Sequence, residues 1–234
     1  MNTCYILLFI IILVLLYILH NTSQESYMNV KIPNHILKYF KKTEFFKNTG
    51  NFKITYLEYE KNKLDAKSYI DATINDFMKK TKNNSKNRYQ IKQIFNNNKL
   101  SNYILNKAYT PIVDFLKLNK KKVNPGYIRV SKAKWSFDYH YDCLDLLLIQ
   151  LCGTRTIYTK KTKTSKVIKN ILKAGDTLFI PMGEYHKVET ETDLNINFNI
   201  IFEQTNEKRI IRCRKKFGYD YKLQKQKCNK NNCI

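Results

Sequence analysis

The sequence lacks three features that would point to familiar classes of protein. No internal repeat is apparent, which argues against a solenoid, and the six cysteines include no Cys-x-x-Cys pair, the usual signature of a structural zinc site. Acidic residues are also few, because 19 Asp and Glu stand against 42 Lys and Arg, for a net charge of +23. With 43% hydrophobic residues among 234, however, the chain has enough apolar content for a folded domain, which excludes a disordered protein.

The positive charge requires an anionic partner or another explanation. Counterion release draws a basic chain to nucleic acid, and a basic face can equally lie against an anionic membrane leaflet. The surplus is lysine, it accompanies many asparagines and isoleucines, and it is spread along the chain, as an AT-rich genome would produce in any protein. Nucleic acid and an anionic membrane surface therefore both stay open as partners, the membrane at least as well supported.

The N-terminus contains one long apolar run, from Cys4 to Leu19. With its flanks it approaches the roughly 20 residues that a bilayer span requires. Neither a basic leader nor a small-residue cleavage site is evident, so we expect an uncleaved transmembrane anchor over residues 1–20. Lysines occur only after the run, which predicts a single-pass membrane protein with the rest of its chain in the cytosol. Glycosylation-type triplets at Asn21 and Asn83 favour the opposite topology, but chance explains them in so asparagine-rich a chain.

Residues 21–120 carry mixed patterns, which we interpret as a helical and mixed N-terminal part. The boundaries come from apolar residues at helical spacing and from short alternating runs. The expected elements are a helix from Pro33 to about Phe46, a strand over Phe52–Tyr59, a helix from Asp65 to about Lys80, a solvated loop over Lys79–Lys99 and a helix over Leu100–Lys107.

The other end of the chain, residues 206–234, is rich in basic residues. We expect a tail that is peripheral to catalysis and adds electrostatic attachment to a membrane or to nucleic acid. The cysteines do not decide the redox compartment, because neither Cys143 and Cys152 beside a predicted strand nor Cys213 and its tail neighbours have a paired spacing.

A His-x-Asp triplet is the first candidate for chemistry. Side chains alternate along a strand, so His140 and Asp142 would share a face and Tyr141 would point away. A second histidine, His186, follows a distant predicted strand. Two imidazoles and one carboxylate form the facial triad that binds Fe(II) and leaves three coordination positions open. Alone, the triplet is weak, and a surface His and Asp in a loop is the competing interpretation.

The residues around the triplet are typical of short barrel strands. We expect strands over Leu146–Leu151, Arg155–Tyr158, Thr177–Ile180 and Leu194–Phe202, with turns at Gly153, Gly175-Asp176 and Pro181 to Gly183. In the last strand, Asn195, Asn197 and Asn199 alternate with apolar residues. They line either a polar cavity or a solvent-facing edge, and the alternation does not distinguish the two.

Together these segments resemble a known architecture. The matching segments are His140-Tyr141-Asp142, Gln150-Leu151 with Gly153 and Arg155, Gly175-Asp176 through Ile180-Pro181, and His186. In order and spacing they are similar to the double-stranded β-helix core of JmjC and cupin-like Fe(II)/2-oxoglutarate-dependent oxygenases, which include asparaginyl and ribosomal-protein hydroxylases. The resemblance covers about residues 126–202.

The resemblance implies roles for individual residues. The two histidines and the aspartate would bind Fe(II). Arg155 lies thirteen positions after Asp142, where the family has the basic residue that pairs with the distal carboxylate of 2-oxoglutarate. A guanidinium suits that role because its planar fork makes two parallel hydrogen bonds to a carboxylate. Asn199, or Asn197 as the alternative, would lie near the same cosubstrate.

One position departs from the family pattern. Many relatives carry a hydroxyl group that helps to hold the cosubstrate where this chain has Phe137. A tyrosine often helps instead, and the sequence does not choose among Tyr103, Tyr109, Tyr127 and Tyr139.

The sequence therefore predicts an α+β, mainly β protein. A double-stranded β-helix core of the cupin or jelly-roll type would occupy residues 121–205, preceded by helices and one transmembrane helix. The predicted function is an Fe(II)/2-oxoglutarate-dependent dioxygenase that hydroxylates a protein side chain or, as the less favoured substrate, RNA. The alternative is a membrane-tethered cupin-like binding module without 2-oxoglutarate turnover, which Phe137 and the unassigned tyrosine leave open.

Overall fold

The computed structural model describes residues 12, 30–60, 67–81, 87–95, 98–132, 136–203 and 213. Apart from residue 12, the predicted anchor over residues 1–20 lies outside this part of the chain, and so does the basic tail except for Cys213. Within the described ranges, no helix is both long enough and apolar enough to cross a membrane.

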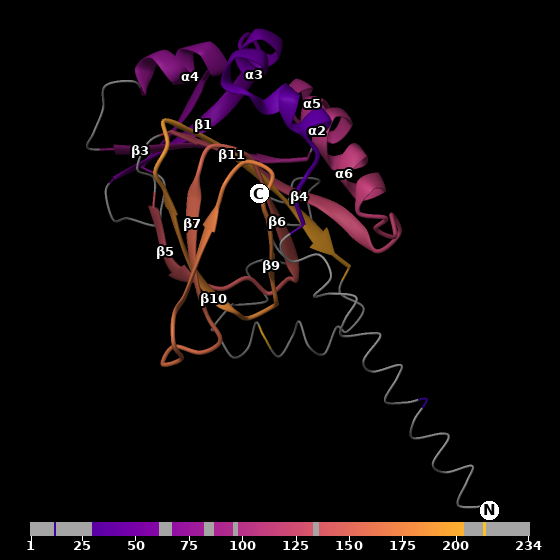
Figure 1. Cartoon of the computed structure of the whole chain (residues 1–234). Coiled ribbons are helices and arrows are strands. Elements are labelled where there is room, and N and C mark those ends of the chain that lie inside the picture. The colour runs from indigo at the N-terminus through magenta and orange to yellow at the C-terminus, as the bar shows by residue number, and fades with distance from the viewer. Residues whose placement is uncertain are drawn as a thin grey trace, which may run out of the picture.

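Most of the described elements are strands, and the short helices all come before β4 in the chain (Figure 1). The helical segments are α2 (Asn34–Leu37), the 3-10 turn η1 (Lys38–Phe40), α3 (Lys42–Thr49), α4 (Ile74–Lys80), α5 (Lys99–Ile104), the π-helical η2 (Leu105–Tyr109) and α6 (Thr110–Phe115). The strands are β1 (Lys53–Glu60), β2 (Ser68–Thr73), β3 (Asn87–Ile94), β4 (Val123–Lys132), β5 (Ser136–His140), β6 (Leu146–Cys152), β7 (Arg155–Lys160), β8 (Ile168–Leu172), β9 (Thr177–Ile180), β10 (Tyr185–Thr190) and β11 (Leu194–Phe202).

Strands β4 to β11 wind between two antiparallel sheets. The larger sheet has the order β2-β1-β3-β4-β11-β6-β9, and the smaller has the order β5-β10-β7-β8. Along the chain, β4, β6, β9 and β11 enter the larger sheet, while β5, β7, β8 and β10 enter the smaller one. This repeated crossing is the winding of a double-stranded β-helix, so the prediction of a mainly β, cupin-type core is confirmed. The N-terminal strands β1 to β3 extend the larger sheet beyond the barrel.

The two faces of the larger sheet have different neighbours. On the outer face, Ile149 of β6 and Phe198 of β11 belong to one large apolar core together with helical residues such as Phe45 and Ile104. Figure 1 shows the helices gathered on that side, away from β5, β7 and β10. Strand β6 is buried on both faces, which explains its apolar run, interrupted only by Gln150.

The inner face looks into the barrel toward the smaller sheet. Part of that interior is a second, smaller apolar cluster, made of Leu148, Ile157, Leu172, Leu178, Ile180 and Val188. The rest of the inner face is polar and forms the candidate site described below.

The helix predicted over Asp65–Lys80 is wrong in its first half. Strand β2 occupies that half, pairs with β1, and is followed by α4 from Ile74. Thr73 and Asp76 form a capping box, in which each side chain accepts a hydrogen bond from the other residue's amide, so the helix starts there. Tyr69, which the helical spacing assigned to the core, is 69% exposed.

The loop predicted over Lys79–Lys99 is also wrong, because it contains β3. That strand lies between β1 and β4 and pairs with both. Tyr89 and Ile91 are buried on its outer face, whereas Gln90 and Lys92 alternate with them on the inner face. Two buried residues at a spacing of two are too weak a signal to identify a strand in a Lys- and Asn-rich segment.

The remaining N-terminal predictions differ mainly at their boundaries. The strand predicted over Phe52–Tyr59 is confirmed as β1. The first predicted helix is divided at Lys41, whose backbone is extended. The helix predicted to end at Lys107 instead continues through the π-helical η2 into α6, which contains Pro111.

Candidate metal centre

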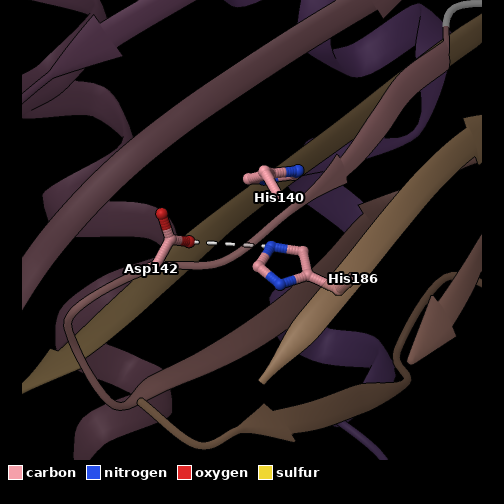
Figure 2. A group of neighbouring side chains, drawn as sticks. All are labelled: His140, Asp142 and His186. Carbon is pink, nitrogen blue, oxygen red and sulfur yellow. Dashed lines mark ion pairs between the residues drawn. The ribbon is translucent and has the colours of Figure 1, made fainter. Parts of the chain in front are cut away.

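Three side chains meet at the mouth of the barrel. His140 ends β5, His186 lies near the start of β10, and the two residues are register partners on adjacent antiparallel strands. Asp142 lies two residues beyond the end of β5, so a loop rather than the predicted strand carries it. One ligand atom from each of the three residues lies within 4.8 Å of the others. Figure 2 shows the Asp142 carboxylate directed at His186, whose Nε2 is 3.6 Å from Oδ2.

Backbone contacts hold the loop that carries Asp142. The amide of Gly183 donates to the carbonyl oxygen of Asp142 at 2.9 Å, and the amide of Met182 donates to Oδ1 of the buried Asp145 at 2.7 Å. Cys143 adds a covalent restraint, because it forms a disulfide with Cys213 across 70 residues of sequence. The cysteine spacing did not predict this pairing.

Both histidines are oriented as metal ligands. Nδ1 of His140 lies 2.8 Å from the carbonyl oxygen of Asp138, and Nδ1 of His186 lies 3.1 Å from that of Glu184. A carbonyl oxygen only accepts, so each Nδ1 carries the proton and donates it, which leaves the Nε2 lone pair for a metal. Desolvation, with the nearby His186, lowers the pKa of His140 to about 4, and desolvation also lowers the pKa of His186. Both imidazoles are therefore neutral near pH 7, as coordination requires.

Arg155 begins β7 and lies inside the barrel. Its side chain is fully buried, and Nε and Nη2 donate to Oδ1 of Asn195 at 3.2 and 2.9 Å. Nη1 is also buried and has no hydrogen-bond partner. Gly153 makes the preceding turn, at a φ of 77°, where a Cβ would collide with the carbonyl oxygen of Leu194.

No acidic side chain within the described ranges forms an ion pair with this guanidinium. Desolvation lowers the pKa of Arg155 well below its usual value, and the positive charge of Arg129 contributes further. A guanidinium nevertheless keeps its proton inside proteins. A buried, unpaired cation is costly, so the site is suited to an anion that enters from outside.

The asparagines of β11 lie on the inner face and not at a solvent-facing edge. Asn195, Asn197 and Asn199 are all buried. Neither side-chain atom of Asn197 has a partner, and Oδ1 of Asn199 has none. The open choice between a polar cavity and an exposed edge is therefore decided against the exposed edge, while the choice between Asn199 and Asn197 beside a cosubstrate stays open.

Sequence reasoning missed several members of this polar wall. Ser131 Oγ, Gln150 Oε1 and Arg129 Nε are buried without a hydrogen-bond partner. Arg129 and Ser131 alternate with the buried Ile128 and Val130 of β4, a period of two that could have revealed them.

The four candidate tyrosines occupy different places. The hydroxyls of Tyr103 and Tyr109 donate to the carbonyl oxygens of Tyr39 and Val123, and both rings pack against the large core of the outer face. Tyr139 lies under the Lys160 ammonium, 4.1 Å from ring centroid to Nζ. Tyr127 shares the inner face with Arg129. Of the four, Tyr127 is the one that alternation directs into the barrel.

Comparisons with known proteins agree with this architecture. Residues 99–210 match the family model described as a JmjC domain. No curated protein matches the chain. Among solved structures, the Drosophila melanogaster CENP-C cupin domain is 16% identical, covers 36% of this chain and 62% of its own, and has a TM-score of 0.31. Drosophila melanogaster CENP-C bound to CAL1 is likewise 16% identical over 36% of this chain and 68% of its own, also with a TM-score of 0.31. At such scores these two likenesses carry no argument, and the agreement with the architecture rests on the JmjC match alone.

Proposed function

Residues 99–210 contain a JmjC-type domain, and from that premise we propose that this protein is an Fe(II)/2-oxoglutarate-dependent dioxygenase that hydroxylates a side chain of a protein substrate. Support comes from two features of the barrel, the triad of His140, Asp142 and His186 and the guanidinium of Arg155, whose Nη1 has no partner. The buried, partnerless Nη1 of Arg155 is the observation that carries the 2-oxoglutarate part of the proposal.

The donor atoms fit Fe(II). Two neutral imidazoles and one carboxylate on one side of an open position are the ligand set of non-haem Fe(II) oxygenases, and an all-oxygen or thiolate set would favour other metals. Bound iron and 2-oxoglutarate would supply the oxidising chemistry, in which 2-oxoglutarate, O2 and a substrate C–H group give succinate, CO2 and a C–OH group, with one oxygen atom of O2 in succinate and the other in the product.

The residues of the chain perform the binding and orienting steps. Arg155 offers an N–H to a distal carboxylate, and Asn195 fixes the guanidinium plane by accepting its other two donors. The buried amide groups of Asn197 and Asn199 supply unpaired donors and acceptors for the rest of the ligand. The apolar residues Leu148 and Val188 belong to the cluster that excludes water from the opposite part of the cavity.

Anaerobic reconstitution of the full chain tests the proposal. With Fe(II), 2-oxoglutarate and O2, we expect succinate, and each Ala substitution at the triad should abolish both metal binding and succinate formation, because an open site has no ligand to spare. His35→Ala is the matched control, since that histidine is exposed and outside the barrel. Mn(II) binding followed by electron paramagnetic resonance reports occupancy without turnover.

The cosubstrate is tested separately at Arg155. Arg155→Gln should retain Mn(II) yet bind 2-oxoglutarate roughly ten- to a hundredfold more weakly, the usual cost of losing a hydrogen bond to a charged group. Arg155→Lys should recover part of the loss, because it restores the charge without the fork. A wild-type protein that binds neither metal nor 2-oxoglutarate would leave the membrane-tethered, cupin-like binding module as the function.

We also propose the topology that the sequence suggests, with residues 1–20 as an anchor and the barrel in the cytosol. Protease added to sealed microsomes should then digest the barrel. Protection would instead place the barrel in an oxidising compartment, where a disulfide such as Cys143–Cys213 is at home.

A further inference from the structure

A row of four polar side chains crosses the inner face of the larger sheet. Lys92 of β3 is the register partner of Arg129 of β4, Arg129 is the partner of Asn197 of β11, and Asn197 is the partner of Gln150 of β6. Register partners lie on the same face about 4.5–5.5 Å apart at Cβ. The row therefore leads from the exposed Lys92 into the barrel, with Arg129 at its second place.

Arg129 is a cation without an anion. Its Nε is buried and has no hydrogen-bond partner, and within the described part of the chain no carboxylate lies in ion-pair contact with it. Its charge contributes to the lowered pKa values of His140, His186 and Arg155, so it lies among the residues of the candidate site. Its contact in the structure is the ring of Tyr127, 5.9 Å from the guanidinium carbon.

Lys92 connects Arg129 to the protein surface. Its ammonium lies 4.9 Å from the centre of the same Tyr127 ring. Desolvation lowers the pKa of Lys92 and so does Arg129, whereas the Asp142 carboxylate opposes the shift. Two like charges side by side repel each other, and an anion between them would stabilise both.

Outside the barrel, Lys92 forms part of the wall of a hollow of about 650 Å³. The hollow lies over β1 and β2, where Thr55 and Asp71 continue the inner face of the sheet. Arg129 follows Lys92 in the row, on the side of Lys92 toward β11.

The lining of the hollow identifies the class of ligand. Among the described residues, no aromatic side chain lines the hollow to stack on bases, and a nucleic acid, with a phosphate at every nucleotide, would meet the carboxylates of Asp71 and Asp76. Threonine, asparagine and lysine side chains suit the mixed groups of an extended polypeptide. In the lining, Lys53 and Lys92 balance Asp71 and Asp76, and Arg129, the register partner of Lys92, adds one further positive charge beside Lys92.

We propose that Lys92 and Arg129 together bind the carboxylate of an acidic side chain in a polypeptide substrate, which lies in the hollow and presents a neighbouring residue to the metal centre. The presentation to a metal rests on the proposed oxygenase function, whereas the acidic-residue site does not. The two arginines lie at different depths and would bind different carboxylates, Arg155 that of 2-oxoglutarate and Arg129 that of the substrate. Arg155 is fully buried and held by Asn195, and Arg129 is half-buried beside the entrance.

Binding of defined peptide pools tests this site. The probe is a pool of fluorescein-labelled decapeptides with one fixed Asp or Glu, compared by anisotropy with a pool that has Asn or Gln at that position. The protein is the full chain with Mn(II) and 2-oxoglutarate, without O2. We expect the acidic pool to bind at least tenfold more tightly, and Lys92→Gln and Arg129→Gln each to remove most of that preference.

The matched control is Lys121→Gln, which removes the same charge from an exposed turn outside the row and should keep the preference. Lys92 is exposed, so its variant tests the site even if Arg129→Gln fails to fold. Equal binding of the two pools, an equal loss in Lys121→Gln, or tighter binding of a polyuridine RNA than of the acidic pool would overturn the inference.

Two readouts separate the two proposals. A preference for the acidic pool that depends on Lys92, without any succinate formation by the aerobic Fe(II) protein, would refute the oxygenase and retain the acidic-residue site. Succinate formation without such a preference would refute the acidic-residue site and retain the oxygenase.

Discussion

The two faces of β11 show how one strand serves two purposes. Ile196, Phe198 and Ile200 point outward into the large core under the helices, and all three are fully buried. Asn195, Asn197 and Asn199 point inward and are just as buried, yet side-chain atoms of the last two lack partners. Burial alone therefore does not reveal what a face does.

The two faces differ in whether they bury polar atoms that lack hydrogen-bond partners. Burying apolar side chains against the helices stabilises the fold by about 1.5–3 kcal/mol each. A buried polar group without a partner costs about 1–3 kcal/mol. A chain keeps several such groups in one cavity when a ligand can satisfy them, which is the physical reason to identify the inner face as the binding face.

The largest effect is expected on the outer face. Phe198→Ala removes a fully buried ring that packs edge-on against Phe95, 6.5 Å between centroids. The free energy of unfolding of the full chain, measured in urea, should fall by about 3–5 kcal/mol. A loss below about 1 kcal/mol would show that the outer core is looser than the structure has it.

An intermediate effect on the free energy of unfolding is expected at Asn195, the inner-face asparagine whose side chain is hydrogen-bonded. Asn195 accepts from Nε and Nη2 of Arg155 and donates to the carbonyl oxygen of Thr154 at 2.9 Å. Asn195→Leu should lower the free energy of unfolding by about 1–3 kcal/mol, because two donors of a buried guanidinium lose their acceptor. The double variant with Arg155→Met should be more stable than Asn195→Leu alone, and urea unfolding of both variants checks this.

The smallest effect on the free energy of unfolding is expected at Asn197, two residues after Asn195. Asn197 is equally buried, but neither side-chain atom has a partner. Asn197→Leu should therefore not lower the free energy of unfolding of the ligand-free protein and should raise it by up to about 1 kcal/mol, because it removes buried polar atoms that have no partner. It should weaken ligand binding if the inner face is the binding face. Destabilisation as large as that of Asn195→Leu would erase the distinction between satisfied and unsatisfied positions.

The prediction from sequence worked best where short-range patterns carry the information. The apolar run over Leu146–Leu151, the alternation after Leu194 and the turn at Gly153 each identified barrel elements, because a strand with one or two buried faces leaves a period in the chain. The prediction failed for β2 and β3. These strands contain too few apolar residues for their alternation to be recognised, so the polar composition of β3 was interpreted as a loop and the spacing in β2 as a helix.

By itself, the sequence identified the candidate triad and Arg155, and the resemblance of their order and spacing to a double-stranded β-helix predicted the winding of the core. Only the tertiary structure decided which polar side chains share the cavity. Lys92, Arg129 and Asn197 come from three strands separated by 105 positions of sequence, and no local pattern relates them. Hydrogen-bonded register across β3, β4 and β11 brings them into one row, and register is set by the pairing of whole strands rather than by any one residue.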